Sequence, residues 1–381
     1  MQEEFFGFGT IDKLSGIINR FDVKKIFLVT GKKSFFSSGA QNKIEKILGG
    51  ISYTRFAVSG NPRLELIENG IKAFQKFNPD IVIAVGGGSA IDAAKIINAL
   101  SYQNDRPEEY IKGKKLECND SDKCAKPLIA IPTTAGTGSE STHFATIYIE
   151  KKKYSLADKH LMLPTISIVD PSLTESLPQY VTATTGLDAI CQGIESFWSI
   201  NSNRESREYA IEAVKIGLEN IEKAVNNPDQ ISRLNMAKAA HLSGKAINIS
   251  KTTACHSVSY PLTSHFGVPH GHAVALIMPS FLEFNSLVSE RDCSDGRGVG
   301  FVMKRMSEIF SIMGVKDGTG AKEKFSDLLN NILEKTRLRD FGIDRKDLEM
   351  LLKESFTPNR MNNNPRRVSK EGLRKILEDI W

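Results

Sequence analysis

The hydrophobic pattern of this chain changes at about residue 180. Before that point, short runs rich in β-branched residues alternate with amphipathic stretches, whereas almost every later stretch has helical spacing. Strands that alternate with helices predict a parallel sheet with helices on both faces. Because 381 residues exceed what one core usually holds, we expect a doubly wound α/β domain over residues 1–180 and an all-α domain over residues 181–381.

The pattern also predicts individual elements. The expected strands are 24–31, 51–58, the start of 80–100, 127–134, 145–158 and 165–170. The expected helices are 40–48, 63–77, the rest of 80–100, 204–223, 232–250, 302–313, 319–336, 345–355 and 369–380. Polar, glycine- or proline-rich stretches predict surface loops at 103–126, 288–298 and 356–368.

Composition narrows the classes of function. The net charge of +5 comes from 50 basic and 45 acidic side chains spread along the chain, so we expect no nucleic-acid partner. No apolar run is long enough to span a membrane, and the first ten residues, MQEEFFGFGT, are not typical of a signal peptide. Five irregularly spaced cysteines are typical of reduced thiols, so we expect a cytoplasmic protein.

A glycine-rich turn follows the strand in the 80–100 stretch. Gly86, Gly87, Gly88 and Ser89 open a helix that continues through Asp92. Consecutive glycines let a pyrophosphate approach the backbone, and the helix start offers N–H groups to it. The pattern is neither G-x-G-x-x-G nor a P-loop, so a tight turn without a ligand stays an alternative.

A second polar turn follows the strand at 127–134. It contains Thr133, Thr134 and Thr137, and its hydroxyls suit ribose and phosphate contacts at the carboxyl end of a strand. The alternative is an N-capping turn before a short helix. Two such turns in one Rossmann-like sheet favour nucleotide binding.

Candidate metal ligands occur in the helical half. Asp188 and Gln192 are one helical turn apart, and four of the seven histidines fall within residues 256–272. A carboxylate with the imidazoles of His256 and His270 would leave positions open on iron(II) or zinc. Each histidine alone is more often a packed or surface residue than a ligand.

Five ordered motifs resemble those of the iron-containing, or group III, alcohol dehydrogenases. They are GGGSAIDAAK (86–95), AIPTTAGTGSE (130–140), SIVDPSLTESLP (167–178), TATTGLDAICQGIES (182–196) and HSVSYPLTSHFGVPHGHAVA (256–275). The resemblance implies a homodimeric enzyme that interconverts an alcohol and an aldehyde. Its cofactors would be NADPH or NADH and a divalent metal, Fe²⁺ or Zn²⁺.

The resemblance also implies roles for single residues. The pyrophosphate would be held by Gly87, Gly88 and Ser89. Gly86 and Asp92 of the same motif would also bind the cofactor. The rest of the cofactor would be lined by Thr133, Thr134, Thr137 and, toward the nicotinamide, Lys153. The metal would be bound by Asp188, His256 and His270.

Two positions depart from the family pattern. Gln192 stands where the family usually has a second metal-binding histidine, and an amide oxygen is a weaker ligand for iron. Tyr260 stands where a proton-relaying histidine often occurs, so we expect the proton to come from Tyr260, His272 or water. If Gln192 marks a lost metal site, the chain would bind a nucleotide without catalysing a reaction.

These departures resemble the subgroup of phosphonoacetaldehyde reductases. In that case Lys251, together with Arg360, Arg366 or Arg367, would hold an anionic substrate group, unless these are simply solvated cations. A second candidate is a sugar-alcohol oxidase like octulosonate 8-oxidase. A third is a lyase like dehydroquinate synthase, against which Asp188 argues because that enzyme has a glutamate there.

The end of the first predicted strand bears on the choice of cofactor. Gly31 occupies the position where NAD-using relatives carry an aspartate for the ribose hydroxyls. Without that carboxylate, and with Lys32 and Lys33 next, the site should accept a 2′-phosphate. We therefore expect NADPH rather than NADH.

Overall fold

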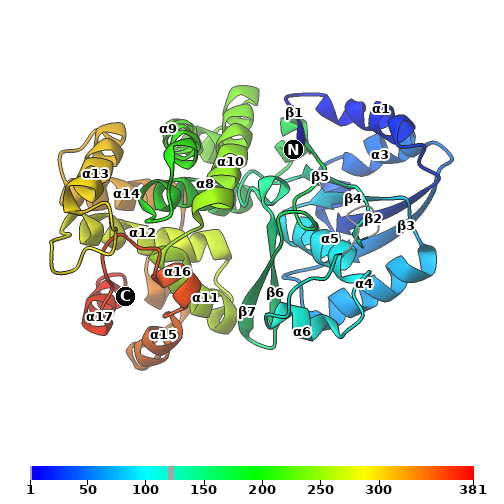
Figure 1. The fold of residues 1–381 in the computed structure, drawn as a ribbon. Coiled ribbons are helices and arrows are strands. Elements are labelled where there is room, and N and C mark those ends of the chain that lie inside the picture. Colours follow the sequence, from blue (N-terminus) through cyan, green and yellow to red (C-terminus); the bar gives the residue numbers. More distant parts are fainter. Residues whose placement is uncertain (1, 119–123) are drawn as a thin grey trace. The chain divides into compact units, whose positions relative to one another are not determined.

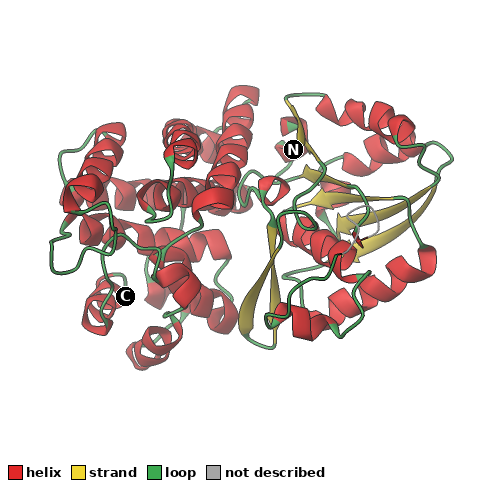
Figure 2. Cartoon of the chain, viewed as in Figure 1, coloured by secondary structure: helices red, strands yellow, loops and turns green. Residues whose placement is uncertain are grey.

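A computed structural model describes residues 2–118 and 124–381. Its contacts divide the chain into two compact units, Met1–Leu177 and Pro178–Trp381. The first unit is built on a sheet and the second is helical (Figures 1 and 2).

The first unit contains a six-stranded sheet in the order β1-β8-β5-β4-β2-β3. Its strands are β1 (Glu3–Phe6), β2 (Lys25–Gly31), β3 (Ser52–Val58), β4 (Ile81–Gly86), β5 (Leu128–Pro132) and β8 (Ile166–Val169). Every neighbouring pair is parallel. The predicted parallel sheet is confirmed, and β1, which the sequence pattern did not reveal, forms one edge.

Helices cover both faces of this sheet. Because successive side chains of a strand point to opposite faces, Ile26 and Leu28 of β2 pack with α1 (Lys13–Arg20) and α3 (Ala40–Leu48). Phe27 and Val29 face the other way and share a second core with α4 (Leu64–Phe77) and α5 (Gly88–Leu100). The two cores confirm the doubly wound arrangement, and Figure 1 shows the helix pairs on opposite sides of the sheet.

The order of the strands reverses between β2 and β4. From β2 the chain moves outward to β3 and then returns to β4 on the other side of β2. At this point the backbones touch, because a Cβ placed on Gly86 would lie 3.0 Å from the amide nitrogen of Gly31 and 2.8 Å from Cβ of Ala90. Open α/β sheets bind ligands at such switch points.

The predicted strand at 145–158 is wrong as a single strand, and it does not join the sheet. β6 (Phe144–Ile149) and β7 (Lys152–Ala157) form a separate antiparallel hairpin, because a short turn at residues 150–151 folds the 145–158 stretch back on itself. Two predicted loops also contain short helices, α6 (Pro107–Ile111) and α16 (Pro358–Met361). Another short helix, α2 (Ser34–Ser37), follows β2.

The second unit is helical among its described residues, as the sequence predicts. Its longer helices are α8 (Gln179–Trp198), α9 (Arg204–Asn226), α10 (Gln230–Ser250), α11 (Ala254–Phe266), α12 (His270–Ser286), α13 (Val299–Met313), α14 (Gly318–Ile332), α15 (Leu348–Glu354) and α17 (Lys370–Asp379). The central α8 is almost wholly buried from Thr182 onward. Gly193 lets it pack closely against α9, since a Cβ there would lie 2.8 Å from Val214.

The cysteines differ from expectation. Cys118 and Cys124 form a disulfide, so the prediction of five reduced thiols is wrong for this pair. Their Cα atoms are 5.6 Å apart, a proximity that sequence spacing alone does not reveal. The residues between them, 119–123, lie outside the described part, whereas Cys191, Cys255 and Cys293 are free thiols.

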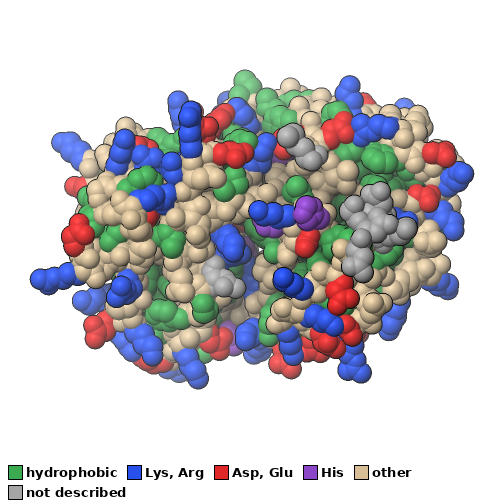
Figure 3. Space-filling view, in the orientation of Figure 1, with side chains coloured by type: hydrophobic (Ala, Val, Ile, Leu, Met, Phe, Trp, Pro, Cys, Tyr) green, Lys and Arg blue, Asp and Glu red, His purple; other side chains and the backbone are tan. Residues whose placement is uncertain are grey.

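Two surface properties bear on partners. On the face in Figure 3, lysine and arginine side chains lie among acidic ones rather than in one continuous basic patch. Within residues 2–118 and 124–381, no helix combines the length and the apolar character needed to cross a membrane.

A buried lysine ties the second polar turn to α5. The Lys95 ammonium, 0% exposed, donates hydrogen bonds to oxygens of Ser139, Thr142 and Phe144. Burial lowers the pKa of Lys95 to about 8, although the nearby Asp92 and Glu140 carboxylates favour the charged form. This lysine therefore organises the segment that follows β5.

Replacing Lys95 should destabilise the first unit. The Lys95→Met variant keeps most of the side-chain length, but it leaves buried carbonyl oxygens without their donor and removes the positive charge near Asp92 and Glu140. We expect a loss of about 3 kcal/mol in the free energy of unfolding, measured by urea denaturation. Lys72→Met, at an exposed position on α4, is the control and should leave stability nearly unchanged. Equal stabilities for the two variants would contradict this role.

Candidate active site

The two predicted cofactor turns lie against each other at the carboxyl end of the sheet. A Cβ on Gly88 would lie 2.7 Å from the Thr137 side chain, and one on Gly87 would lie 3.4 Å from Thr134. No side chain caps the start of α5, and Gly87, Gly88 and Ser89 are partly exposed, whereas α5 is buried from residue 90 to residue 100. An open helix start beside hydroxyls is suited to a pyrophosphate.

Not every residue of these turns faces the opening. The Asp92 carboxylate accepts hydrogen bonds from Ser139 Oγ at 2.5 Å, Thr146 N at 2.8 Å and Thr146 Oγ1 at 2.9 Å. We therefore correct the prediction that Asp92 binds the cofactor, because its carboxylate fastens the second turn and β6 to α5. Thr133 is fully buried, and its amide donates to the carbonyl of Gly86.

Two further predicted cofactor residues lie in different parts of the first unit. Gly31 ends β2 at the switch point, and Ser34 Oγ occupies the space where a side chain on Gly31 would begin. Lys153 is half-buried on β7, where it pairs with Tyr148 of β6. Gly31 thus adjoins the glycine turn, whereas Lys153 belongs to the separate hairpin.

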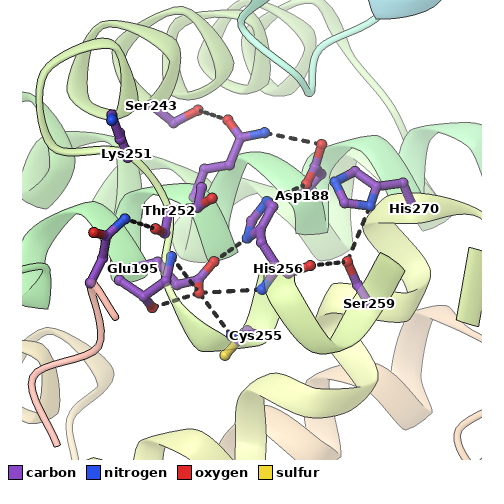
Figure 4. A network of polar contacts seen from close by, with 12 residues as sticks. Asp188, Glu195, Ser243, Lys251, Thr252, Cys255, His256, Ser259 and His270 are labelled. Carbon is purple, nitrogen blue, oxygen red and sulfur yellow. Dashed lines mark hydrogen bonds and ion pairs between the residues drawn. The ribbon is translucent and has the colours of Figure 1, made fainter. Parts of the chain in front are cut away.

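Three predicted metal ligands converge in the second unit. The ligand atoms of Asp188, His256 and His270 all lie within 4.8 Å of one another. His256 Nε2 is 3.5 Å from Asp188 Oδ1, and this buried nitrogen has no hydrogen-bond partner among the described residues. One carboxylate and two imidazoles fit iron(II) or zinc with room for a substrate oxygen. Figure 4 shows the three side chains pointing toward one another.

Three helices bring these ligands together, and a glycine makes their approach possible. Asp188 lies on α8, His256 on α11, and His270 at the first position of α12. A Cβ on Gly271 would collide with the carbonyl oxygen of Thr184 and lie 2.8 Å from Cβ of Asp188. Gly271 therefore lets the start of α12 lie directly against α8, which sets His270 beside Asp188.

Gln192 has a different role from the predicted one. Its amide nitrogen donates to Asp188 Oδ2 at 3.1 Å, and its amide oxygen accepts from Ser243 Oγ at 3.2 Å. An amide nitrogen does not ligate a metal in this arrangement, so we correct the assignment of Gln192 as a ligand. Instead, Gln192 orients the Asp188 carboxylate, and the three-ligand set does not depend on it.

A buried glutamate that the sequence analysis did not select contacts His256. Glu195 is 0% exposed, and its Oε2 is hydrogen-bonded to His256 Nδ1. Burial lowers the pKa of His256, but the Glu195 and Asp188 carboxylates outweigh burial and raise it to about 9. A metal ion must therefore displace a proton from this imidazole to bind. The spacing of Asp188, Gln192 and Glu195 on one helix face is the signal that identifies the group.

The two remaining proton-donor candidates lie in different environments. The Tyr260 ring is 6.0 Å from the His270 ring, so Tyr260 adjoins the cluster. His272 is 0% exposed, with Nδ1 hydrogen-bonded to Tyr180 Oη at 3.0 Å and Nε2 to the carbonyl of Lys335 at 2.8 Å. Both nitrogens of His272 are occupied, so we correct its assignment as a proton donor. Burial also lowers the pKa of His272.

The predicted anion-binding cations separate into two groups. Lys251 follows α10, is exposed, and makes no ion pair with any described residue. Arg360 lies on α16, which packs against α11. Arg366 is paired with Asp292 at 2.6 Å, and together with Arg367 it lines a pocket beside α17. Because Asp292 neutralises Arg366, we remove Arg366 from the predicted anion site.

The two nearby histidines should respond differently to substitution. We expect His270→Leu to abolish bound zinc because it removes one of three ligands. His272→Leu should retain zinc but lose about 1–3 kcal/mol of stability, because it removes the two hydrogen bonds that the buried His272 ring makes with Tyr180 Oη and the carbonyl of Lys335. Elemental analysis and urea denaturation test both variants. If His272→Leu instead lost zinc while its stability stayed unchanged, the assignment of His272 as a structural residue and not a metal ligand would be wrong.

Comparison with known proteins identifies the family. The family model described as iron-containing alcohol dehydrogenase matches residues 2–171, and its C-terminal model matches residues 182–381. The chain is 34% identical over 304 residues to phosphonoacetaldehyde reductase of Streptomyces viridochromogenes, covering 78% of this chain and 75% of that protein. It is 29% identical to sulfoacetaldehyde reductase of Bilophila wadsworthia, covering 98% and 95% of the two chains.

A solved structure extends the similarity to the whole fold. Sulfoacetaldehyde reductase from Bifidobacterium kashiwanohense, in complex with NAD⁺, superposes with a TM-score of 0.86 at 28% identity. The match covers 100% of this chain and 96% of that chain. Sequence and fold agree along the full length, so this chain belongs to the iron-containing alcohol dehydrogenase family and is a nicotinamide-dependent oxidoreductase that interconverts alcohols and aldehydes.

Proposed function

We propose that this enzyme reduces a small anionic aldehyde, of the phosphonoacetaldehyde type, to the corresponding alcohol. The observation that carries the proposal is the converging set of Asp188, His256 and His270. Two relatives described above are a phosphonoacetaldehyde reductase and a sulfoacetaldehyde reductase. Both of these substrates carry an anionic group close to the aldehyde. The exposed cation Lys251 supplies a partner for such a group.

The backbone at Lys251 supports a functional role for this residue. Lys251 has φ 61° and ψ 172°, a conformation that residues other than glycine rarely adopt. Its amide donates to the carbonyl of Ile247, and Ser250 Oγ donates to its carbonyl at 3.1 Å. Strained backbone that its surroundings hold in place is concentrated at functional sites.

The three ligands suit a divalent metal. Asp188, His256 and His270 would hold Fe²⁺ or Zn²⁺, which when bound would polarise the aldehyde oxygen as a Lewis acid. Gln192 keeps the Asp188 carboxylate in place through a hydrogen bond. These side chains are largely buried, and exclusion of water strengthens their electrostatic effect on a substrate.

Other residues would bind the reactants and move the proton. The pyrophosphate of the cofactor would lie on the start of α5 at Gly88 and Ser89. Reduced nicotinamide would give hydride to the carbonyl carbon, and the Tyr260 hydroxyl would give a proton to the oxygen. One aldehyde, one NADPH and one proton would thereby become one alcohol and one NADP⁺, with the tyrosine reprotonated from solvent.

The cellular setting is also part of the proposal. Reduced nicotinamide is supplied in the cytoplasm, where we expect this enzyme to act. The family resemblance favours a homodimer, which light scattering of the purified protein can test.

The anionic-aldehyde proposal is tested through Lys251. We expect purified, zinc- or iron-loaded enzyme to oxidise NADPH with phosphonoacetaldehyde and to act much more slowly on propanal. Lys251→Met should lower kcat/KM for phosphonoacetaldehyde about 10- to 100-fold, since a hydrogen bond to a charged group contributes about 1.5–3 kcal/mol. The value for propanal should stay nearly unchanged.

The control for this variant is Lys238→Met. Lys238 lies on α10, the helix that Lys251 follows, and its ammonium is paired with Glu212 at 2.6 Å. It should leave both rates unaltered. Equal losses on the two aldehydes in Lys251→Met would contradict anion binding by Lys251, and preference for propanal in the unmodified enzyme would contradict an anionic substrate.

The end of β2 supports NADPH as the reductant. Gly31 has no carboxylate to repel a 2′-phosphate, and Ser34 Oγ lies beside it. The next residues, Lys32 and Lys33, add positive charge at the same turn. Hydroxyls and ammonium groups suit a phosphate better than a ribose hydroxyl alone.

Introducing a carboxylate at Gly31 should shift the cofactor preference. Gly31→Asp meets only the movable Ser34 side chain within hydrogen-bonding range, so we expect the protein to fold. The ratio of kcat/KM for NADPH to that for NADH should fall at least about tenfold, because like charges repel. Gly50→Asp adds the same charge in open space and should leave the ratio unchanged. An unaltered ratio in Gly31→Asp would place the 2′-phosphate elsewhere.

A further inference from the structure

We propose that Glu195 is a positioning residue that fixes the protonation pattern of His256 so that its Nε2 faces the metal. The inference rests on the metal site of the proposed function but concerns a residue outside the ligand set. Glu195 and Asp188 are both on α8, two helical turns apart. Figure 4 shows Glu195 on one side of the His256 ring and Asp188 on the other.

One carboxylate oxygen of Glu195 accepts hydrogen bonds from residues at the start of α11. Its Oε1 accepts hydrogen bonds from Thr253 N at 3.0 Å, Thr253 Oγ1 at 2.6 Å and Cys255 N at 2.9 Å. Amide groups at a helix start have no partner within the helix. Because the Thr253 side chain does not cap α11, the glutamate from α8 supplies the acceptor. These donors hold the carboxylate in one orientation.

The other oxygen then determines which His256 nitrogen carries a proton in the ligating form. Oε2 is an acceptor beside His256 Nδ1, so the proton stays on Nδ1 and the lone pair lies on Nε2. Nε2 is the atom that faces Asp188 at 3.5 Å. A carboxylate behind a ligating histidine also raises its basicity and commonly changes metal affinity 10- to 100-fold.

His270 offers an internal comparison. Its Nδ1 is 3.3 Å from Ser259 Oγ, and that hydroxyl donates to the carbonyl of His256 at 2.8 Å. The hydroxyl therefore accepts from His270 Nδ1–H, which again leaves Nε2 for the metal. The second histidine thus has a neutral partner, whereas the first has a buried carboxylate, so Glu195 should have the larger effect on affinity.

Glu195→Gln separates this role from simple packing. The four donors at the start of α11, which include His256 N at 3.4 Å, require an acceptor, so the amide oxygen must take the place of Oε1. The amide NH₂ then faces His256 Nδ1, which must accept, and the imidazole proton moves to Nε2. The variant keeps the shape of the side chain and its contacts with α11, but it removes the lone pair that the metal needs.

The test measures metal binding and the histidine tautomer, without turnover. We expect Glu195→Gln to bind Zn²⁺ about 10- to 100-fold more weakly than the unmodified protein by competition with a chromogenic chelator. Long-range ¹H–¹⁵N NMR of the imidazoles should show His256 protonated at Nδ1 in the zinc-loaded unmodified protein and at Nε2 in the neutral, metal-free variant. Glu283→Gln, which loses an ion pair with Lys322 elsewhere in the unit, should bind zinc normally.

Either of two results would overturn the proposal. One is unchanged zinc affinity in folded Glu195→Gln, and the other is a His256 without a proton on Nδ1 in the zinc-loaded unmodified protein. The second measurement needs no variant, so it decides the matter even if the substitution prevents folding. An enzyme that prefers a neutral aldehyde would refute the proposed substrate but leave these results unaffected.

Discussion

The buried carboxylate of Glu195 connects the helices on which the metal cluster depends. It extends from α8 to the first amides of α11 and to the imidazole of His256. Asp188, two turns earlier on α8, contacts the same imidazole from the other side. A carboxylate without partners would be very costly to bury, so the helix start and the histidine stabilise the charge while the charge fixes their positions.

Close backbone approach is the second constraint, and glycine provides it in both units. In the first unit, Gly86 and Gly88 let the two cofactor turns and the end of β2 lie in contact. In the second, Gly271 lets α12 begin directly against α8, beside Asp188. Each of these positions would meet backbone or a neighbouring side chain if it carried a Cβ. The side chains that would hold the ligands therefore lie next to glycines, which have no side chain to prevent the close approach.

The sequence motifs identified the metal ligands, but they did not identify the residues that surround them. Asp188, His256 and His270 were expected from residue type and spacing, and they converge in the structure. His272 has the same chemistry and lies two residues from His270, yet both of its nitrogens are occupied by Tyr180 and Lys335. Residue type does not show which nitrogen is occupied, because the partners come from distant parts of the chain.

The sequence by itself determined the parallel sheet with its glycine turn, the helical second half and the family, because periodicity and ordered motifs are local properties. Tertiary structure decided that the β6–β7 hairpin stands apart from the sheet, and that Cys118 meets Cys124. It also decided that Gln192 orients a carboxylate instead of binding metal, and that Glu195 stands behind His256. The physical reason is that hydrogen-bond partners are set by packing between segments, which no single stretch of sequence encodes.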